Sequence, residues 1–456
     1  MEKQTKTYQQ GGIAYRMFRS YIRFFHDGIY YRRTYSLNTE NIPDAGTPLM
    51  IVSNHQNCLN DPLGILLSLR DRKPYFIIRA DVFGYHPLVN KFAYWIGGLP
   101  AFRIAYEGEE ALKRNKDTFT LSGQKLQNGS TIVMFPEAGH QDKHWLGDFT
   151  VGFTKMAFEA AALGNFETDI LILPSCNHYS DYFQLQEQML IKYGVPISLR
   201  PFYELYQTKP RTAQRRFSDL VHKQIQDLML DIRDLDNYEA IDFIRTTYGR
   251  EFATFHQYDH EKLPDRLSSD RLLVERLERA GENGKKDELA NLFADALTLK
   301  KGMDEMKIHD ALFEQCPSWI AVTGSLLALI LLFPAWLFSL WPNAINYVVP
   351  TILINRMTDK MFYGSFILIF SILFTIPVFY AVTFFLTWHF TNVWLALIHL
   401  LSLPLLGLFA WYYLKFFKRT IKAVRFRLNF RTQKMKDLRE LRKEITGKLD
   451  ELIKYG

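Results

Sequence analysis

Cysteine is scarce in this sequence of 456 residues. The three cysteines, Cys58, Cys176 and Cys316, lack the short spacing of a metal site and are too few for a disulfide framework. We therefore expect no metal site and a reducing compartment. The first residues, Met-Glu-Lys-Gln-Thr-Lys, are polar, so the apolar core of a signal peptide is also missing.

The sequence has no block of lysine and arginine interleaved with aromatic residues, such as a nucleic-acid surface would need. The formal net charge of +7 is modest for this length. It is compatible with a surface near anionic lipid or phosphate groups. We expect no nucleic-acid partner.

Charged residues are absent from two stretches, residues 317–355 and 361–414. A transmembrane helix needs about 20 apolar residues, so we expect one span over 319–341 and two helices in the second stretch, broken near 388–392. The remainder of the first stretch carries Pro342 and Pro350 and is too short and broken for another ordinary span. Tryptophan and tyrosine residues near the ends of these two stretches are typical of membrane interfaces.

Seven basic residues follow the second apolar stretch between Lys415 and Arg431. By the positive-inside rule this tail is cytoplasmic. Three crossings would then leave the N-terminal part of the chain on the opposite side. A cytoplasmic catalytic domain requires an even number, so the first stretch is either re-entrant or crosses twice, and the sequence does not decide between them.

Before these stretches, apolar runs alternate with helical patterns. This alternation predicts an α/β domain whose mixed sheet is flanked by helices. We expect strands over 48–52, 73–78, 98–103, 130–135 and 169–174, and helices over 62–69, 107–126 and 152–163.

We divide the chain into five regions on composition. Aromatic and basic residues alternate over 15–33, which predicts an amphipathic helix at a membrane interface or packed on the domain. A charged region from about 209 to 313 predicts accessory helices without a catalytic cluster. The regions are 1–35 (amphipathic helix), 36–230 (catalytic domain), 231–316 (charged helices), 317–414 (transmembrane) and 415–456 (basic cytoplasmic tail).

His55 and Asp61 follow the first predicted strand in a polar loop. A separation of six residues does not place two side chains on one helix face, so the loop must fold back if they are to meet. Pro62 favours a helix start, and we expect Asp61 to be the N-cap of that helix. An imidazole oriented by a carboxylate is the minimal set for a general base. On this stretch alone, a simple helix cap beside a loop histidine remains an alternative.

Polar or glycine-containing islands adjoin four of the apolar runs. They are Asn54-His55 with Asp61, Gly98 with Phe102-Arg103, Phe135-Pro136-Glu137-Ala138-Gly139-His140, and Leu173-Pro174. In this order and spacing the set resembles the phospholipid/glycerol acyltransferase family, which moves fatty acyl groups from a thioester to a glycerol-phosphate hydroxyl. The resemblance covers roughly residues 51–174. It implies an enzyme of phospholipid biosynthesis.

Two departures from the family pattern are informative. Five residues separate His55 from Asp61, where the family usually has four; this spacing is similar to that of membrane-bound glycerol-3-phosphate and dihydroxyacetone-phosphate acyltransferases. Ala138 stands where the family has glycine, which moves the expected tight turn to Gly139. Arg79 falls where the family often carries a basic residue.

The chemistry of the residues agrees with this resemblance. Transfer to an alcohol needs a base, and free imidazole titrates near pH ~6.5. Since the attacking oxygen belongs to the acceptor, no serine or cysteine nucleophile is required. Arg103, assisted by Arg79, is expected to bind the phosphate. Glu137 is expected to accept hydrogen bonds from glycerol hydroxyls. The resemblance implies Gly98, Phe102, Gly139 and Pro174 as further substrate-site residues.

We therefore expect a multi-pass membrane acyltransferase that uses glycerol-3-phosphate. It needs no cofactor, takes acyl-CoA or acyl-carrier protein as co-substrate, and contacts the bilayer. A lysophosphatidate acceptor is the alternative within the class. A hydrolase would need metal ligands or a serine motif, and neither is visible in the sequence. A transporter or scaffold is the non-enzymatic alternative, although His389 and His399 are the only strongly polar titratable groups in the apolar stretches.

Overall fold

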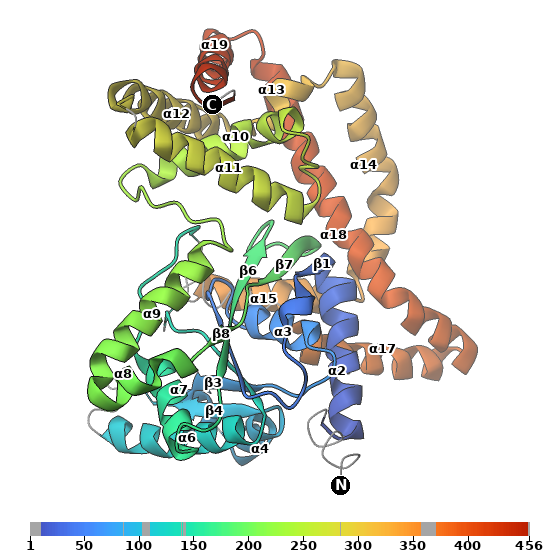
Figure 1. Cartoon of the computed structure of the whole chain (residues 1–456). Helices are drawn as coiled ribbons and strands as arrows, with labels where there is room; N and C mark the ends of the chain where they lie inside the picture. Colours follow the sequence, from blue (N-terminus) through green and yellow to red (C-terminus); the bar gives the residue numbers. More distant parts are fainter. Residues whose placement is uncertain are drawn as a thin grey trace. The chain divides into compact units, whose positions relative to one another are not determined.

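The computed structural model describes residues 11–84, 86–102, 110–137, 139, 143–282, 284–356 and 371–454. The chain divides into two compact units (Figure 1). The first unit contains Met1–Leu230 and Ile354–Leu373, and the second contains Asp231–Leu353 and Phe374–Gly456. Each unit is described separately below.

The first unit is built on an eight-stranded mixed sheet. The strands are β1 (Tyr31–Leu37), β2 (Leu49–Ser53), β3 (Tyr75–Arg79), β4 (Gly98–Ala101), β5 (Thr131–Met134), β6 (Leu171–Tyr179), β7 (Glu187–Tyr193) and β8 (Ile197–Ser198). Their order is β1-β7-β6-β2-β5-β3-β4, with β8 also paired to β6. The predicted α/β fold with a mixed sheet is confirmed.

The central strands β6, β2, β5, β3 and β4 are all parallel to one another. Their carboxyl ends therefore meet at one edge of the sheet, where α/β proteins place their chemistry. Strand β2 lies between β5 and β6, with Val52 opposite both Met134 and Pro174. The loop after β2 consequently has the ends of β5 and β6 as its immediate neighbours.

Helices cover both faces of the sheet. One face packs against α6 (Glu110–Gln127), α7 (Gly152–Leu163) and α9 (Pro210–Gln226) through fully buried side chains such as Phe153 and Phe217. On the other face, α3 (Asn60–Ser68) packs against β7. The remaining short elements of this unit are α4 (Pro87–Trp95), α8 (Tyr203–Thr208), η2 (Thr39–Asn41), η3 (Ala80–Gly84) and η4 (Arg200–Phe202).

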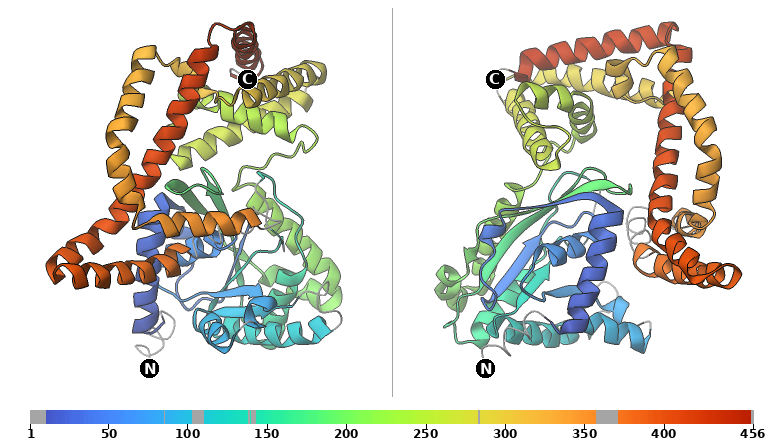
Figure 2. Two further views of the ribbon diagram at one scale, coloured as in Figure 1. Left: turned by 180° about the vertical axis from the view of Figure 1, so that it is seen from behind. Right: turned by 90° about the vertical axis from the view of Figure 1, so that its right-hand side faces the viewer.

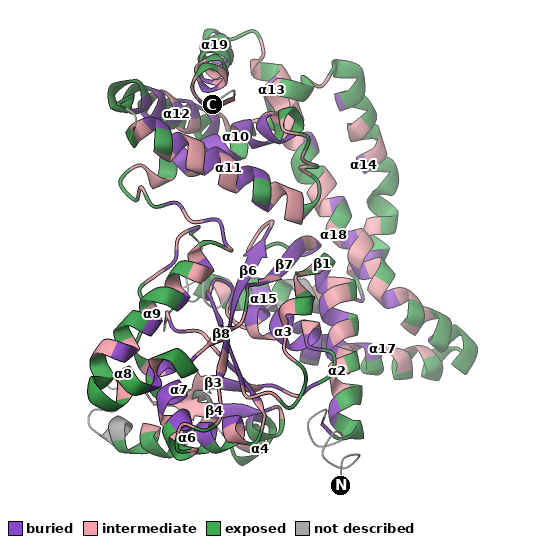
Figure 3. Ribbon diagram, in the orientation of Figure 1, coloured by how far each residue is buried: buried purple, intermediate pink, exposed green. Residues whose placement is uncertain are grey.

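The N-terminal helix is shorter than predicted. Helix α2 covers Ile13–Phe25, a π-helical turn η1 covers His26–Tyr30, and β1 begins at Tyr31. The prediction of a helix to residue 33 was wrong because the last residues pair in parallel with β7, a contact between distant parts of the chain. The helix is amphipathic: it buries three residues, Tyr15, Ile22 and Phe25, and exposes three others, Ile13, Met17 and Phe24 (Figure 3).

Charged helices form one part of the second unit. They are α10 (Tyr238–Phe255), α11 (Leu263–Glu282), α12 (Lys286–Met306), α13 (Ala311–Gln315), α19 (Gln433–Leu449) and the π-turn η6 (Asp450–Lys454). Arg245 and Asp270 form a buried ion pair between α10 and α11, with Nη1 and Oδ2 2.7 Å apart. Breaking such a pair leaves a buried charge without its partner, which is strongly destabilising.

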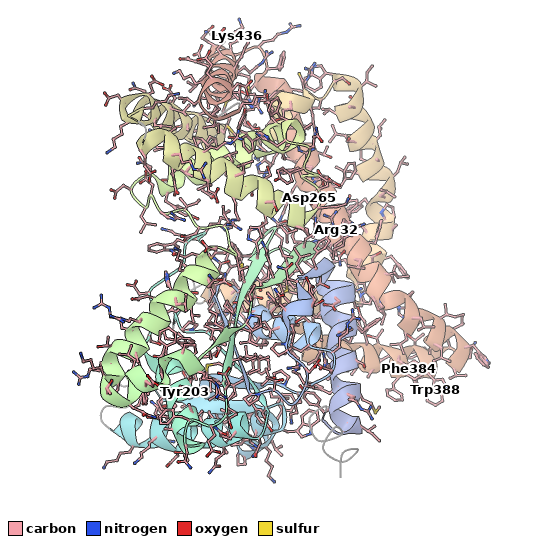
Figure 4. All side chains as sticks on the ribbon, viewed as in Figure 1. Arg32, Tyr203, Asp265, Phe384, Trp388 and Lys436 are labelled. Atoms are coloured by element: carbon pink, nitrogen blue, oxygen red, sulfur yellow. The ribbon has the colours of Figure 1, made fainter. Side chains whose placement is uncertain are left out.

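Within the described residues, three helical segments are long and apolar enough to cross a membrane. They are Trp319–Leu340 (α14), Ser371–Phe390 (η5, Ser371–Thr375, continued by α17, Ile376–Phe390) and Val393–Asn429 (α18). The expected break in the second apolar stretch is confirmed at residues 391–392. Phe384 and Trp388, labelled in Figure 4, stand on α17 with ring centroids 6.0 Å apart. The broken end of the first stretch forms α15 (Ala344–Arg356), with Pro350 inside it.

A buried asparagine joins the apolar helices. The Tyr380 hydroxyl of α17 donates to Asn343 Oδ1 over 2.9 Å, and Asn343 Nδ2 donates to the carbonyl oxygens of Ser339 and Leu403. A Cβ added at Gly407 would lie 3.1 Å from the same amide oxygen. Amide hydrogen bonds of this kind specify which helices meet in an apolar environment.

Both ends of the apolar block return to the charged bundle. Helices α14 and α18 lie side by side (Figure 2), and α19, which follows α18, packs on α12, which precedes α14. Two ion pairs join α19 to α12, Lys448 to Asp295 and Lys434 to Glu305, and a third, Arg442 to Asp310, joins α19 to the residue before α13. Segments packed in this way lie on one side of any membrane that the apolar helices cross.

Candidate active site

The loop after β2 folds back on itself, so that His55 Nδ1 lies 2.7 Å from Asp61 Oδ2. Cys58 makes the turn with a left-handed backbone, φ 39°, and the N–H of Asn60 donates to the carbonyl of Asn57. The expected proximity of His55 and Asp61 is confirmed. Asp61 is not an N-cap, however, since α3 begins at Asn60 and the carboxylate is directed back into the loop.

Asp61 is fully buried and surrounded by donors. Its Oδ2 accepts the backbone N–H groups of Gln56 and Asn57, each over 2.8 Å, and its Oδ1 accepts the Tyr179 hydroxyl over 2.5 Å. A carboxylate with these donors acts as an acceptor toward the imidazole. His55 Nδ1 therefore carries a proton, and Nε2 is the nitrogen able to take another.

The imidazole of His55 is also held by stacking and by its own backbone. Its ring stacks on Phe135 with centroids 4.4 Å apart, and its side chain is 21% exposed. The backbone N–H of His55 donates to Glu137 Oε1 over 2.7 Å, and the Gly147 N–H donates to Oε2 over 2.9 Å. Glu137 thus ties the His55 loop to the segment that follows β5.

Both carboxylate oxygens of Glu137 are engaged by backbone amides. In this geometry Glu137 positions the loop, and its expected contact with a glycerol hydroxyl stays a prediction. Burial raises the pKa of Glu137 to about 7, against the opposing effect of the two amide hydrogen bonds and of His55.

Of the predicted phosphate-binding residues, Arg79 lies farther along the same edge. Arg79 ends β3, two strands from β2, and forms an ion pair with Asp81. Strand β4, which leads to Phe102, is three strands from β2. At about 4.8 Å per strand these positions are about 10 and 14 Å from the β2 axis. Arg103 lies outside the described residues.

The other residues of the second motif have backbone roles. Gly98 begins β4 and is buried; a Cβ there would lie 2.8 Å from the Ala93 carbonyl oxygen, which explains the glycine. The backbone of Phe102 is held by Asn115, whose side chain accepts its N–H over 2.9 Å and donates to its carbonyl over 2.7 Å. The guanidinium of Arg114 lies 3.9 Å from the Phe102 ring centroid.

Gly139 and Pro174 differ in their surroundings. Gly139 is exposed, and a Cβ there would meet no atom of the described residues within 4 Å. Pro174 is buried in β6 opposite Val52, one residue from the strand end that carries the His55 loop. Its carbonyl accepts the Gly194 N–H over 2.8 Å.

Sequence reasoning missed the contribution of residues 177–182. Asn54 and Asn177 exchange two hydrogen bonds, of 2.7 and 3.0 Å, between side chain and backbone. Tyr182 donates its hydroxyl to Gln56 Oε1 and accepts from Asn57 Nδ2 at its carbonyl, each over 3.1 Å. Neither Asn177 nor Tyr182 belongs to a recognisable short motif. In the described part of the chain, no three His, Cys, Asp or Glu side chains are grouped as metal ligands would be.

The pKa of Glu137 predicts a pH-dependent stability. The group titrates near 4.5 when solvated and near 7 in the fold, so the unfolded chain loses its proton first as the pH rises. Stability should therefore fall between about pH 4.5 and 7 by on the order of 3 kcal/mol and then level off. Urea unfolding in detergent at a series of pH values measures this.

Glu137→Gln should remove that fall, because glutamine does not titrate, although its amide disrupts one of the two acceptor positions at every pH. Glu167→Gln, at an exposed glutamate of the same unit, is the control and should keep the wild-type slope. Equal slopes in wild type and Glu137→Gln would refute the assignment.

The chain was compared with known proteins. A family model described as Acyltransferase matches residues 33–177, which include most of β1, β2 to β5, the His55 loop and most of β6. No curated protein sequence matches the chain. A crystal structure of the 1-acyl-sn-glycerophosphate (LPA) acyltransferase PlsC from Thermotoga maritima aligns with 45% of this chain and 79% of that chain, at 18% identity and a TM-score of 0.31. On the family match, the motifs and the fold that carries them, residues 33–177 of the chain form a domain of the Acyltransferase family.

Proposed function

We propose that this protein transfers a fatty acyl group from an acyl thioester to a hydroxyl of glycerol-3-phosphate, with His55 as general base and Asp61 as its partner. The observation that carries the proposal is the 2.7 Å contact of His55 Nδ1 with Asp61, at the carboxyl edge of the sheet. A lysophosphatidate acceptor is the alternative, since both acceptors offer a phosphate and a free hydroxyl.

The reaction needs two proton transfers. His55 Nε2 takes the proton of the acceptor hydroxyl as the oxygen attacks the thioester carbonyl, and Asp61 stabilises the imidazolium that forms. The tetrahedral intermediate then collapses, the carbon–sulfur bond breaks, and the thiolate takes the proton from the imidazolium. The products are the ester and the free thiol, and no covalent acyl-enzyme or cofactor is needed.

The preference for glycerol-3-phosphate rests on the five residues between His55 and Asp61, a spacing similar to that of the glycerol-3-phosphate and dihydroxyacetone-phosphate branch. Arg103 and Arg79 would bind the acceptor phosphate, since a guanidinium matches its oxygens with paired donors. The donor would be acyl-CoA or acyl-carrier protein.

We propose further that the protein is a multi-pass membrane protein with its catalytic domain in the cytoplasm. Packing of α12 on α19 supports an even number of crossings between them. Either α14 and α18 cross and α17 does not, or α15 takes part in a fourth crossing. The basic residues after Leu414 support the cytoplasmic side. Anchoring at the membrane suits the reaction because the acyl chain is strongly held in the bilayer. At ~0.8 kcal/mol for each of about 15 methylenes, the free energy gained by burying the chain is more than about 10 kcal/mol.

Replacing the dyad should abolish acyl transfer. His55→Ala and Asp61→Ala should each lower the rate by about 10²–10⁴-fold, the usual contribution of general acid–base catalysis. The assay uses purified protein in detergent, labelled acyl-CoA, and three acceptors side by side: glycerol-3-phosphate, dihydroxyacetone phosphate and lysophosphatidate.

Two exposed residues of the same unit, replaced in His86→Ala and Asp117→Ala, are the controls and should stay close to wild type. Transfer to lysophosphatidate alone would overturn the proposed acceptor. Full activity of His55→Ala would overturn the proposed base.

Arg103→Ala should mainly weaken acceptor binding. Loss of a paired contact to phosphate is expected to raise KM for glycerol-3-phosphate by about 10–100-fold, with a smaller change in kcat. Arg103→Lys should recover only part of the affinity because lysine cannot pair with two oxygens. Arg32→Ala, on β1, is the charge-matched control (Figure 4). An unchanged KM would remove Arg103 from the phosphate site.

The topology can be tested with single cysteines in a background lacking Cys316. Lys116→Cys in α6 and Lys436→Cys in α19 should both react with an impermeant maleimide in inside-out vesicles, and neither in right-side-out vesicles. Reaction of the two from opposite sides would show an odd number of crossings. Thr391→Cys, between α17 and α18, should react from the opposite side whether the chain crosses two or four times, because α18 separates it from Lys436.

A further inference from the structure

We infer that Tyr179 is a positioning residue of the acyltransferase site, whose hydroxyl sets the orientation and basicity of the Asp61 carboxylate and, through it, of His55. This inference rests on the proposed function. It assigns a role to a side chain that lies outside all four motifs and just beyond the matched region, which ends at residue 177.

The two oxygens of Asp61 have different partners. Oδ2 faces the loop, where it accepts His55 Nδ1 and the two backbone amides. Oδ1 faces away from the loop and accepts the Tyr179 hydroxyl over 2.5 Å. The carboxylate is thus held from opposite sides, and rotation about its Cβ–Cγ bond would break both contacts. Fixing this plane fixes the imidazole that bonds to it.

The sheet determines the position of Tyr179. It is the last residue of β6, it pairs with Met189 of β7, and it is 2% exposed. Strand β6 is parallel to β2 with Ser175 opposite Ser53, so the chain beyond this pair runs directly beside the His55 loop. The hydroxyl reaches Asp61 because the two strands are neighbours.

Tyr179 remains a donor over the working pH range. Burial, together with Asp61 and Tyr31, raises the pKa of its hydroxyl well above the usual value. Its ring packs near Tyr31 and Tyr182, with centroids 6.1 and 5.6 Å away. A buried hydroxyl in such a place is costly unless it is hydrogen-bonded, and the buried carboxylate needs the donor in the same way.

Residues on either side of Tyr179 hold the same loop. The Asn177 backbone is paired with Asn54, and Tyr182 contacts Gln56 and Asn57. The end of β6 therefore contacts the loop at residues 54, 56, 57 and 61. Among these contacts, the Tyr179 hydroxyl is the one made to a charged group of the dyad.

The contact has a consequence for the pH profile. Without the hydroxyl, more negative charge stays on Asp61, so the imidazolium form of His55 is held more strongly and Asp61 itself gains a proton more readily. Both effects remove the active form, neutral His55 with ionised Asp61, at a higher pH. The acid limb of kcat/KM should therefore move upward.

Other titratable groups near the pair must be considered. Those that face Tyr179 or Asp61 are Tyr31 from the start of β1, His55 from the loop, Glu137 after β5 and Tyr182 after β6. Tyr30 of η1 and Asp181 after β6 act on Tyr31 in turn. The ring of His144 lies beside that of Tyr182 and beside that of His178. A Tyr179 substitution leaves all of these side chains in place.

The experiment compares kcat/KM for acyl transfer from pH 5.5 to 9 in full-length wild type, Tyr179→Phe and Tyr193→Phe. Tyr193 is the matched control: it is a fully buried tyrosine on the neighbouring strand β7, and it loses a hydroxyl contact with Ser68 instead. We expect Tyr179→Phe to move the acid limb up by about one pH unit, with about tenfold lower activity at pH 7 and partial recovery at high pH. Tyr193→Phe should lose stability without moving the limb.

A second variant tests the same contact in the other direction and preserves the fold. Replacing Tyr179 by 3-fluorotyrosine keeps the hydroxyl and makes it a stronger donor, so the acid limb should move down. An unmoved limb in both Tyr179 variants, or an equal shift in Tyr193→Phe, would overturn the inference. Absence of transfer by wild type, or full activity of His55→Ala, would instead refute the proposed function.

Discussion

A buried carboxylate is the constraint on which the site depends. Asp61 has no contact with solvent, and such a charge is tolerated only when donors surround it. Its donors come from the loop that it closes, from the imidazole of His55 and from Tyr179 on the adjacent strand. The same hydrogen bonds therefore fold the loop and orient the ring of His55.

The order of strands explains why these groups meet. Because β2 lies between β5 and β6, the His55 loop has Glu137 on one side and Tyr179 on the other. Strands β3 and β4 extend the same edge, and Arg79 at the end of β3 is two strands away from β2. The order of strands thus determines which side chains surround the His55 loop.

In the second unit, the charged segments before and after the apolar helices pack together. Three apolar helices suggest an odd number of crossings, whereas the charged segments before and after them pack into one bundle through α12 and α19. Ion pairs between these helices, such as Lys448 with Asp295, cannot form across a bilayer. Separating these charged helices would break those ion pairs, and the long α18 leads from the apolar helices to α19 in the bundle.

The amino-acid sequence by itself determined the features that depend on local patterns. Apolar runs predicted β2, β5 and the helix over 152–163, and the charge-free stretches predicted the apolar helices. The loop from His55 to Asp61 predicted the pairing of those two residues. Tertiary structure decided what depends on distant partners: that Tyr31 starts a strand paired with β7, that Glu137 holds backbone amides, and that Tyr179 reaches Asp61. These contacts join residues far apart in the chain, and no local periodicity or spacing encodes such a pairing.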